Sequence, residues 1–167
     1  MSTKNDYSSE EWKAISGAPV AAGLFIVLAD ASGPVGISKE AHAVRNAITD
    51  AARGDAPEII KALAETAKSG GERPELPDVP KGDSAKMRVA LIRTIKTAVD
   101  AVERKSPGEL DAYRTWLASV ATKVAHASKE GGFLGIGGTL VSSDEQAALD
   151  QLADVLGVDA RTDTPHS

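Results

Sequence analysis

The sequence predicts an all-α protein: a single-domain bundle of six or seven helices with a long crossover, rich in proline and glycine, near Ser69–Gly82. Apolar residues recur at spacings of three and four along most of the chain, which is typical of helices that bury one face. No segment shows the strict alternation of apolar and polar residues that indicates a half-buried strand. Aromatic residues make up only 4% of the chain while alanine is abundant, and small side chains let helices pack closely.

The length of 167 residues suits a single domain that can bury a core without a disulfide or a structural metal. We expect a flexible N-terminus over residues 1–7, one helical domain over 8–158 and a disordered tail over 159–167. The net charge of −5 argues against a general affinity for nucleic acid, which needs a basic face. Cysteine is absent, which fits a reducing cytosol, and the sequence shows neither a signal peptide nor a spanning segment. It therefore predicts a cytoplasmic protein without a nucleic-acid partner.

The first helix start has a strong local signal. Ser8 and Glu11 have the spacing of a capping box, in which each side chain binds the backbone N–H of the other residue. Tyr7 and Trp12 stand where a hydrophobic staple places its two apolar side chains. We expect this short helix to end near Ser16.

Three more helix starts precede the crossover. Pro19 is expected to begin a second helix that ends near Ala31, because the first turn does not need the missing N–H of proline. That helix is apolar nearly all round, which predicts a central position. Ser38 and Asp55 are the predicted caps of the next two helices, and the prolines of Ser69–Gly82 then exclude a helix.

The second half begins with two capped helices. Asp83 or Ser84 is the predicted cap of a helix that ends near Arg104. Ser106 and Glu109 then have capping-box spacing around a proline at the first helical position. The helix that follows carries apolar residues at alternating spacings of three and four, typical of the seam of a bundle: Leu110, Tyr113, Leu117, Val120, Val124 and Ala127.

A glycine-rich loop, Gly131–Gly138, leads into the last helix. Ser142 with Glu145 forms one candidate capping box, and Ser143 with Gln146 forms the same box one residue later. The helix start is therefore predicted, whereas its register stays open. The helix then shows an apolar face and a glycine stop: Leu149, Leu152, Leu156 and Gly157.

Two glycine loops share an order of residues. Gly33–Ala41 and Gly137–Ala147 both run from glycine through an apolar residue to serine, glutamate and alanine. Together with Val155–Val158, this pattern resembles the TerB-like family, small all-helical proteins named for tellurite resistance. The resemblance covers Val20–Val44 and Ala118–Val158, about two fifths of the chain. It implies a helical fold, divalent metal binding through acids of the two loops, and a role in membrane-linked stress complexes.

Acids beside these loops are candidate ligands of a divalent metal. Ca²⁺ and Mg²⁺ take oxygen ligands, and loops shaped by glycine can add backbone carbonyls. The same acids can instead be helix caps, because the dipole at a helix N-terminus favours negative charge. Both interpretations stay open, and the candidate metal ligands are Asp30, Glu40, Asp144 and Glu145.

Two surfaces are candidates for contact with a partner. Phe133, Leu134 and Ile136 give the glycine loop an apolar tip, which either docks on a partner or a membrane surface or folds back onto the bundle. Basic side chains also cluster on the helix after Asp83. Such a pattern is typical of a solvated face, or of a site for an acidic protein or anionic lipid: Lys86, Arg88, Arg93, Lys96, Arg104 and Lys105.

The sequence thus favours a non-enzymatic cytosolic protein, related to stress, that binds a partner protein or a divalent metal ion, with Ca²⁺ or Mg²⁺ as the candidate cofactor. A homo-oligomer fits this interpretation. One alternative is a scaffold or assembly protein that contacts a partner or membrane surface through the apolar loop tip. Another is an enzyme that uses the carboxylates between the two loops as acid and base. We assign no catalytic residue, because neither a phosphate-binding loop nor a nucleophile elbow is present.

Overall fold

A computed structural model describes residues 3–29, 46–47, 49–50, 56–68, 83–129 and 141–159. These residues form helices and no strand, which confirms the all-α fold class. The predicted crossover lies outside the described residues, as does part of the chain on which the predicted helix number depends. The elements are η1 (Lys4–Asp6), α1 (Ser9–Val27), α3 (Glu58–Lys68), α4 (Ser84–Lys105), η3 (Pro107–Glu109), α5 (Leu110–Lys129) and α6 (Ser143–Leu156).

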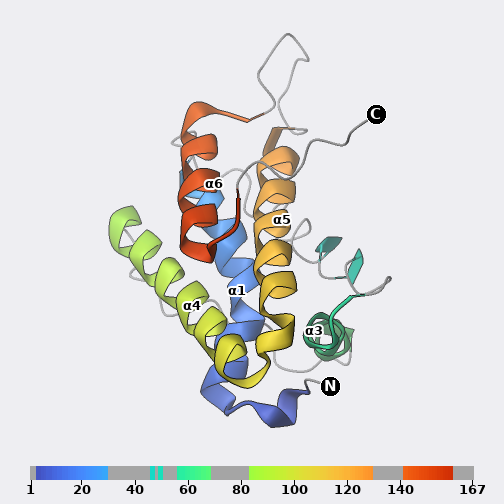
Figure 1. The fold of residues 1–167 in the computed structure, drawn as a ribbon. Helices are drawn as coiled ribbons and strands as arrows, with labels where there is room; N and C mark the ends of the chain where they lie inside the picture. Colours follow the sequence, from blue (N-terminus) through green and yellow to red (C-terminus); the bar gives the residue numbers. More distant parts are fainter. Residues whose placement is uncertain are drawn as a thin grey trace.

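Helix α1 is the centre of the bundle and packs against α4, α5 and α6 (Figure 1). Its apolar residues lie all round the helix, so it loses most of its surface to neighbours. Helix α3 lies beside the N-terminal part of α5 (Figure 1). The largest fully buried apolar side chains come from all five of these helices: Ile15, Phe25, Ile26, Ile59, Leu91, Ile95, Val102, Tyr113, Leu117, Leu152 and Leu156.

The predicted break between Ser16 and Pro19 is wrong, because α1 runs without interruption from Ser9 to Val27. A proline inside a helix cannot donate to the carbonyl four residues earlier, which here is that of Ile15. The hydroxyl of Tyr113, on α5, donates a hydrogen bond to this oxygen at 3.0 Å. A side chain from another helix therefore replaces the donor that Pro19 lacks.

Tyr113 is fully buried, and burial, followed by the nearby Tyr7, raises the pKa of its phenol well above the ordinary value. The phenol consequently keeps the proton that it donates. This single contact between α5 and α1 combines packing with a hydrogen bond in the core.

Three local signals are confirmed where α1, α4 and α6 begin. The Ser8–Glu11 and Ser142–Glu145 capping boxes both form, and the second fixes the register of α6 that the sequence left open. Asp83 caps α4 by accepting from the backbone N–H of Lys86 at 3.0 Å.

A fourth signal is confirmed at the end of α6. Gly157 adopts the left-handed conformation, with φ of 67°, that glycine accepts without steric strain. It ends the helix where the sequence predicts.

The capping box predicted at Ser106 and Glu109 is wrong. Ser106 makes no side-chain cap; its hydroxyl instead shares a 2.7 Å hydrogen bond with the hydroxyl of Tyr7. The carboxylate of Glu109 accepts from the backbone N–H of Ile59 at 2.9 Å, in the first turn of α3. Both side chains thus join separate elements instead of capping their own helix, although Pro107 does stand at the start of η3 as predicted.

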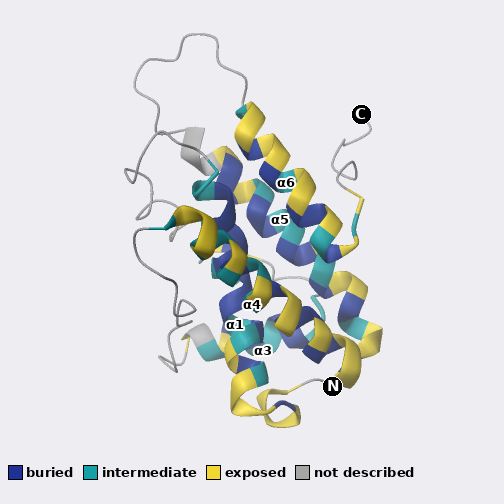
Figure 2. Ribbon diagram, turned by 90° about the vertical axis from the view of Figure 1, so that its left-hand side faces the viewer, coloured by how far each residue is buried: buried dark blue, intermediate teal, exposed yellow. Residues whose placement is uncertain are grey.

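The predicted apolar faces of α4, α5 and α6 point into the core, whereas their other faces are exposed (Figure 2). Each described side chain of the α5 seam is buried, from Leu110 to Val124; the Ala127 side chain lies outside the described ones. Within the described part of the chain, no helix has both the length and the apolar character required to cross a membrane.

Candidate functional site

The start of α6 contains the two predicted metal ligands that the structure describes. Asp144 is exposed, whereas its neighbour Glu145 is only 1% exposed. One oxygen of the Glu145 carboxylate accepts from the backbone N–H of Ser142 at 2.8 Å, and the Ser142 hydroxyl accepts from the N–H of Glu145 at 3.2 Å. Glu145 is therefore a capping residue in the wall of the core, as the capping interpretation predicts.

The other two predicted metal ligands, Asp30 and Glu40, lie outside the described residues, so the four-acid metal site stays a prediction. Among the residues that the structure does describe, no three His, Asp or Glu side chains lie together as a metal would require. The apolar loop tip of Phe133, Leu134 and Ile136 also lies outside the described residues and stays a prediction.

Helix α4 presents the basic residues that the sequence singles out, and four residues of its exposed face form a line. We name Lys86, Val89, Arg93 and Lys96 the basic stripe; successive members are three, four and three residues apart, so they share one helix face. Val89 is 61% exposed and is the one large apolar side chain in the described ranges with such exposure. The stripe thus combines three cations with one exposed apolar side chain.

The ends of the basic stripe differ in their contacts. Lys86 forms a 3.1 Å ion pair with Asp83, within the first turn of its own helix, and both side chains remain substantially exposed. Arg93 and Lys96 form no ion pair with any residue of the described ranges. They are the cations of α4 that are available to a partner.

Arg88 is half-buried and is not part of the basic stripe, because its side chain contacts other helices of the same chain. Its guanidinium lies 4.7 Å from the centre of the Phe25 ring and donates to the side-chain oxygen of Gln151 at 3.1 Å. Guanidinium groups are attracted to aromatic faces at this distance. Arg88 therefore links α4 to α1 and α6.

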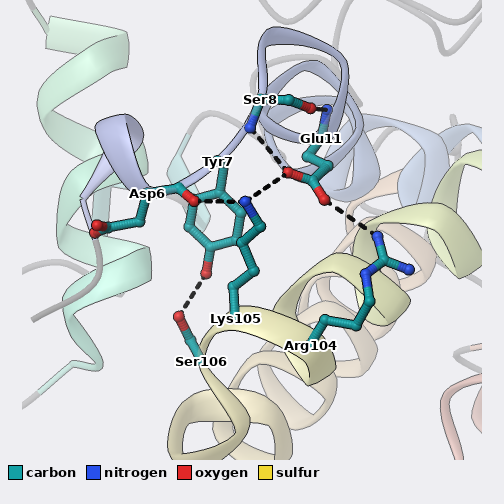
Figure 3. Close-up of polar contacts among 7 residues, drawn as sticks. All are labelled: Asp6, Tyr7, Ser8, Glu11, Arg104, Lys105 and Ser106. Atoms are coloured by element: carbon teal, nitrogen blue, oxygen red, sulfur yellow. Dashed lines mark hydrogen bonds and ion pairs between the residues drawn. The ribbon is translucent and has the colours of Figure 1, made fainter.

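The last two basic residues of α4 hold the N-terminal segment (Figure 3). Arg104 and Lys105 contact the two carboxylate oxygens of Glu11 at 3.1 and 3.3 Å, and Lys105 also donates to the backbone oxygen of Asp6 at 2.8 Å. The hydroxyl of Tyr7 meets Ser106 beside them. We name six residues the N-terminal clamp: Asp6, Tyr7, Glu11, Arg104, Lys105 and Ser106. Figure 3 shows them together with Ser8.

The N-terminal clamp holds Glu11 in its charged form. The hydrogen bond from the backbone N–H of Ser8, aided by Arg104 and Lys105, lowers the pKa of Glu11 to about 2 from an ordinary value of 4.5. Tyr7 lies within residues 1–7, the N-terminal segment that the sequence predicts to be flexible. Its side chain is buried and packs on Trp12, with ring centres 5.9 Å apart. The predicted staple is confirmed, and Tyr7 has a second role in the N-terminal clamp through its bond with Ser106.

Sequence reasoning missed the N-terminal clamp because its two halves are almost 100 residues apart. Local spacing identified Ser8 and Glu11 as a cap, and only the pair of cations at the end of α4 hinted at an acidic neighbour. Comparison with protein-family models, with curated proteins and with solved structures found no match for this chain. The resemblance to TerB-like proteins therefore stays a prediction.

Proposed function

We propose that this protein is a non-enzymatic binding protein of the cytoplasm that recognises an acidic surface of a partner protein through the basic stripe. The observation that carries the proposal is the separation of charge: an acidic chain, with a net charge of −5, gathers exposed cations around Val89 on one helix face. Such a face attracts an acidic partner over a distance and fixes its orientation.

The polar side chains in the interior support this proposal, because their hydrogen bonds serve the fold. Tyr113 donates to a carbonyl inside α1, Tyr7 shares a hydrogen bond with Ser106 at the end of α4, and Glu145 caps the start of α6. Among the residues that the structure describes, the basic stripe combines exposed cations with the exposed apolar side chain of Val89.

Photo-crosslinking in cells that produce the protein tests this function. A photoreactive phenylalanine analogue in place of Val89 is expected to form a covalent adduct with another polypeptide. The matched control carries the same analogue in place of Lys123, an exposed residue of α5 away from the basic stripe. Adducts from position 89 but not from position 123 support the proposal, and the absence of adducts from position 89 contradicts it.

A second candidate function is the binding of a divalent metal ion. The observation that favours it is the exposed carboxylate of Asp144, which has no hydrogen bond or ion pair within the described ranges and follows the glycine loop by six residues in the sequence. The resemblance to TerB-like proteins points the same way. A ligand that binds only the folded state raises the free energy of unfolding by about 2.7 kcal/mol at a hundredfold excess over Kd.

Thermal unfolding of chelator-treated protein with Ca²⁺ or Mg²⁺ tests the metal. We expect one ion to raise the Tm of the wild type, Asp144→Asn to abolish the shift, and Asp154→Asn, at the other end of α6, to retain it. Asp144→Asn is preferable to a Glu145 variant because Asp144 takes no part in the capping box. If neither ion changes the Tm of the wild type, the metal function is wrong.

A further inference from the structure

Helix α6 carries an exposed line of residues with the same spacing as the basic stripe and the opposite charge. We name Asp144, Ala147, Gln151 and Asp154 the acidic stripe; they too are three, four and three residues apart, and all four are exposed. Helix α6 contains neither lysine nor arginine. The carboxylates of Asp144 and Asp154 form no ion pair with the described residues.

The two stripes lie on neighbouring helices. The contact between Arg88 and Gln151 joins α4 to α6, and both helices lie on the left-hand side of the molecule in Figure 1. Figure 2 shows this side face on, with exposed residues along both helices. The colours of Figure 1 show that α4 and α6 run in the same general direction, from the upper to the lower part of the view.

We propose that the acidic partner is a second copy of this chain, held by the basic stripe of each copy against the acidic stripe of the other. The inference rests on the proposed function and names its partner. A twofold axis that lies in the interface and runs along the helices would place α4 opposite α6 of the second copy, and α6 opposite its α4. Such an interface uses the same patch on both copies, as a symmetric dimer requires.

The register of the two stripes matches in this arrangement. The first and last residues of each stripe are ten positions apart, which corresponds to about 15 Å along a helix axis. With the helices parallel, Lys86 lies opposite Asp144, and Lys96 lies opposite Asp154. Between these ends, Val89 meets the small Ala147, and Arg93 meets Gln151.

The charges beyond the stripes agree with this register. The exposed face of α4 becomes acidic at Asp100, one turn after Lys96. Helix α6 ends at Leu156, and Gly157 then turns the chain away. The acidic part of α4 therefore has no acidic helix opposite it. An unrelated acidic protein would require only the basic stripe, whereas a second copy accounts for the opposite charges of both stripes.

Sedimentation analysis of the wild-type chain at two salt concentrations is the first part of the test. At 0.01 M salt, where charges act over about 30 Å, we expect twice the mass of one chain; at 1 M salt, where screening reduces this to about 3 Å, we expect a single chain. A monomer at both salt concentrations overturns the proposal, as does a dimer that salt does not weaken.

A charge exchange between the stripes is the second part. One variant carries Arg93→Glu with Lys96→Glu, and the other carries Asp144→Lys with Asp154→Lys. Each variant alone is expected to be monomeric at low salt, because both of its contacts repel. An equal mixture should form a dimer, since each reversed stripe then meets a stripe of opposite charge. Lys123→Glu, at an exposed position of α5, is the control and should dimerise like the wild type.

Circular dichroism checks that each variant is folded. If Asp144→Lys unfolds α6 because it places a cation at the start of the helix, the single variant Asp154→Lys replaces the double α6 variant. Variants that dimerise alone, or a mixture that stays monomeric, overturn the proposal. The crosslinking experiment separates this inference from the function on which it rests. An adduct of Val89 with a different protein, together with a monomeric chain, supports the proposed function and overturns the self-association.

Discussion

Helices α1 and α6 begin with the same device and use it in different ways. The distances in the two capping boxes agree closely: the backbone N–H of the serine donates at 2.8 Å in both, and its hydroxyl accepts at 3.1 Å in α1 and 3.2 Å in α6. The carboxylate of Glu11 is 18% exposed and pairs with two cations of α4, whereas Glu145 is buried in the core.

The difference teaches that a local motif fixes where a helix begins but not what else its side chains do. In α1 the cap also anchors the N-terminal clamp, and the helix interior depends on Tyr113 of α5. In α6 the cap, the left-handed Gly157 and the bond between Gln146 and Asp150 all stay within the helix and its ends. Helix α1 is therefore joined to other elements by polar contacts at its start and in its interior, whereas α6 combines packing with the hydrogen bond from Arg88 to Gln151.

The largest expected effect comes from removing the hydrogen bond by which Tyr113 of α5 supports the interior of α1. Tyr113→Phe leaves the carbonyl of Ile15 without its donor inside the core, so we expect the free energy of unfolding in urea to fall by about 1–3 kcal/mol. The control is the same substitution in a Pro19→Ala background, where residue 19 regains an N–H for this carbonyl. The cost of Tyr113→Phe should be smaller there, and equal costs in both backgrounds would contradict the role assigned to Tyr113.

A smaller effect compares the two capping boxes directly. Glu145→Ala leaves the N–H of Ser142 without its partner in a half-buried place and empties a buried site, so we expect a loss of about 1–2 kcal/mol in urea unfolding. Glu11→Ala should cost less, because water reaches the start of α1 and can replace the carboxylate. Glu145→Gln, which keeps an acceptor and the side-chain volume, is the control. A larger loss from Glu11→Ala would show that the clamp outweighs burial.

The smallest expected effect concerns the capping carboxylate of α1, Glu11, and the way in which it makes the stability of the fold depend on pH. The pKa of Glu11 is about 2 in the folded chain, below its ordinary value of 4.5, because of the bond from Ser8 and the cations of α4. The unfolded chain therefore binds more protons in this window, so the contribution of Glu11 is complete above about pH 4.5 and is lost as the pH falls towards 2.

Glu11→Gln should accordingly flatten the decline of stability between these pH values, as followed by thermal unfolding. Asp6 and Asp83, whose pKa values are also lowered by hydrogen bonds to Thr3 and Lys86, keep part of the slope in this variant. Glu10→Gln, at the exposed neighbouring position, serves as the control. An identical slope for Glu11→Gln and wild type would show that the clamp does not stabilise the charged carboxylate.

The sequence predicts the parts of the fold that depend on residues close together in the chain. Ser8, Asp83, Ser142 and Gly157 each mark a helix end through contacts with backbone groups at most four residues away. The same reasoning fails at Pro19, because the donor that compensates for it lies on another helix. It also fails for the Ser106 cap, because the hydroxyl of Tyr7 competes for Ser106.

The candidate site follows the same rule. The basic residues of α4 and the acids of α6 are visible in the sequence, and helical spacing is enough to group each set on one face. Which cations are free for a partner is not visible. Arg88 is held by Phe25 and Gln151, and Arg104 by Glu11, so only the folded chain separates them from Arg93 and Lys96.

The central position of α1 has a consequence for the way the protein is made. Helix α1 is synthesised well before these partners, because the hydroxyl that completes its interior lies 98 residues further along the chain and the serine that binds Tyr7 lies 99 residues further along. At a synthesis rate of about 5–20 residues per second, this interval lasts roughly 5–20 seconds. Until these residues are made, α1 lacks the polar partners that complete it in the folded chain, which makes the nascent helix a natural client for chaperones at the ribosome.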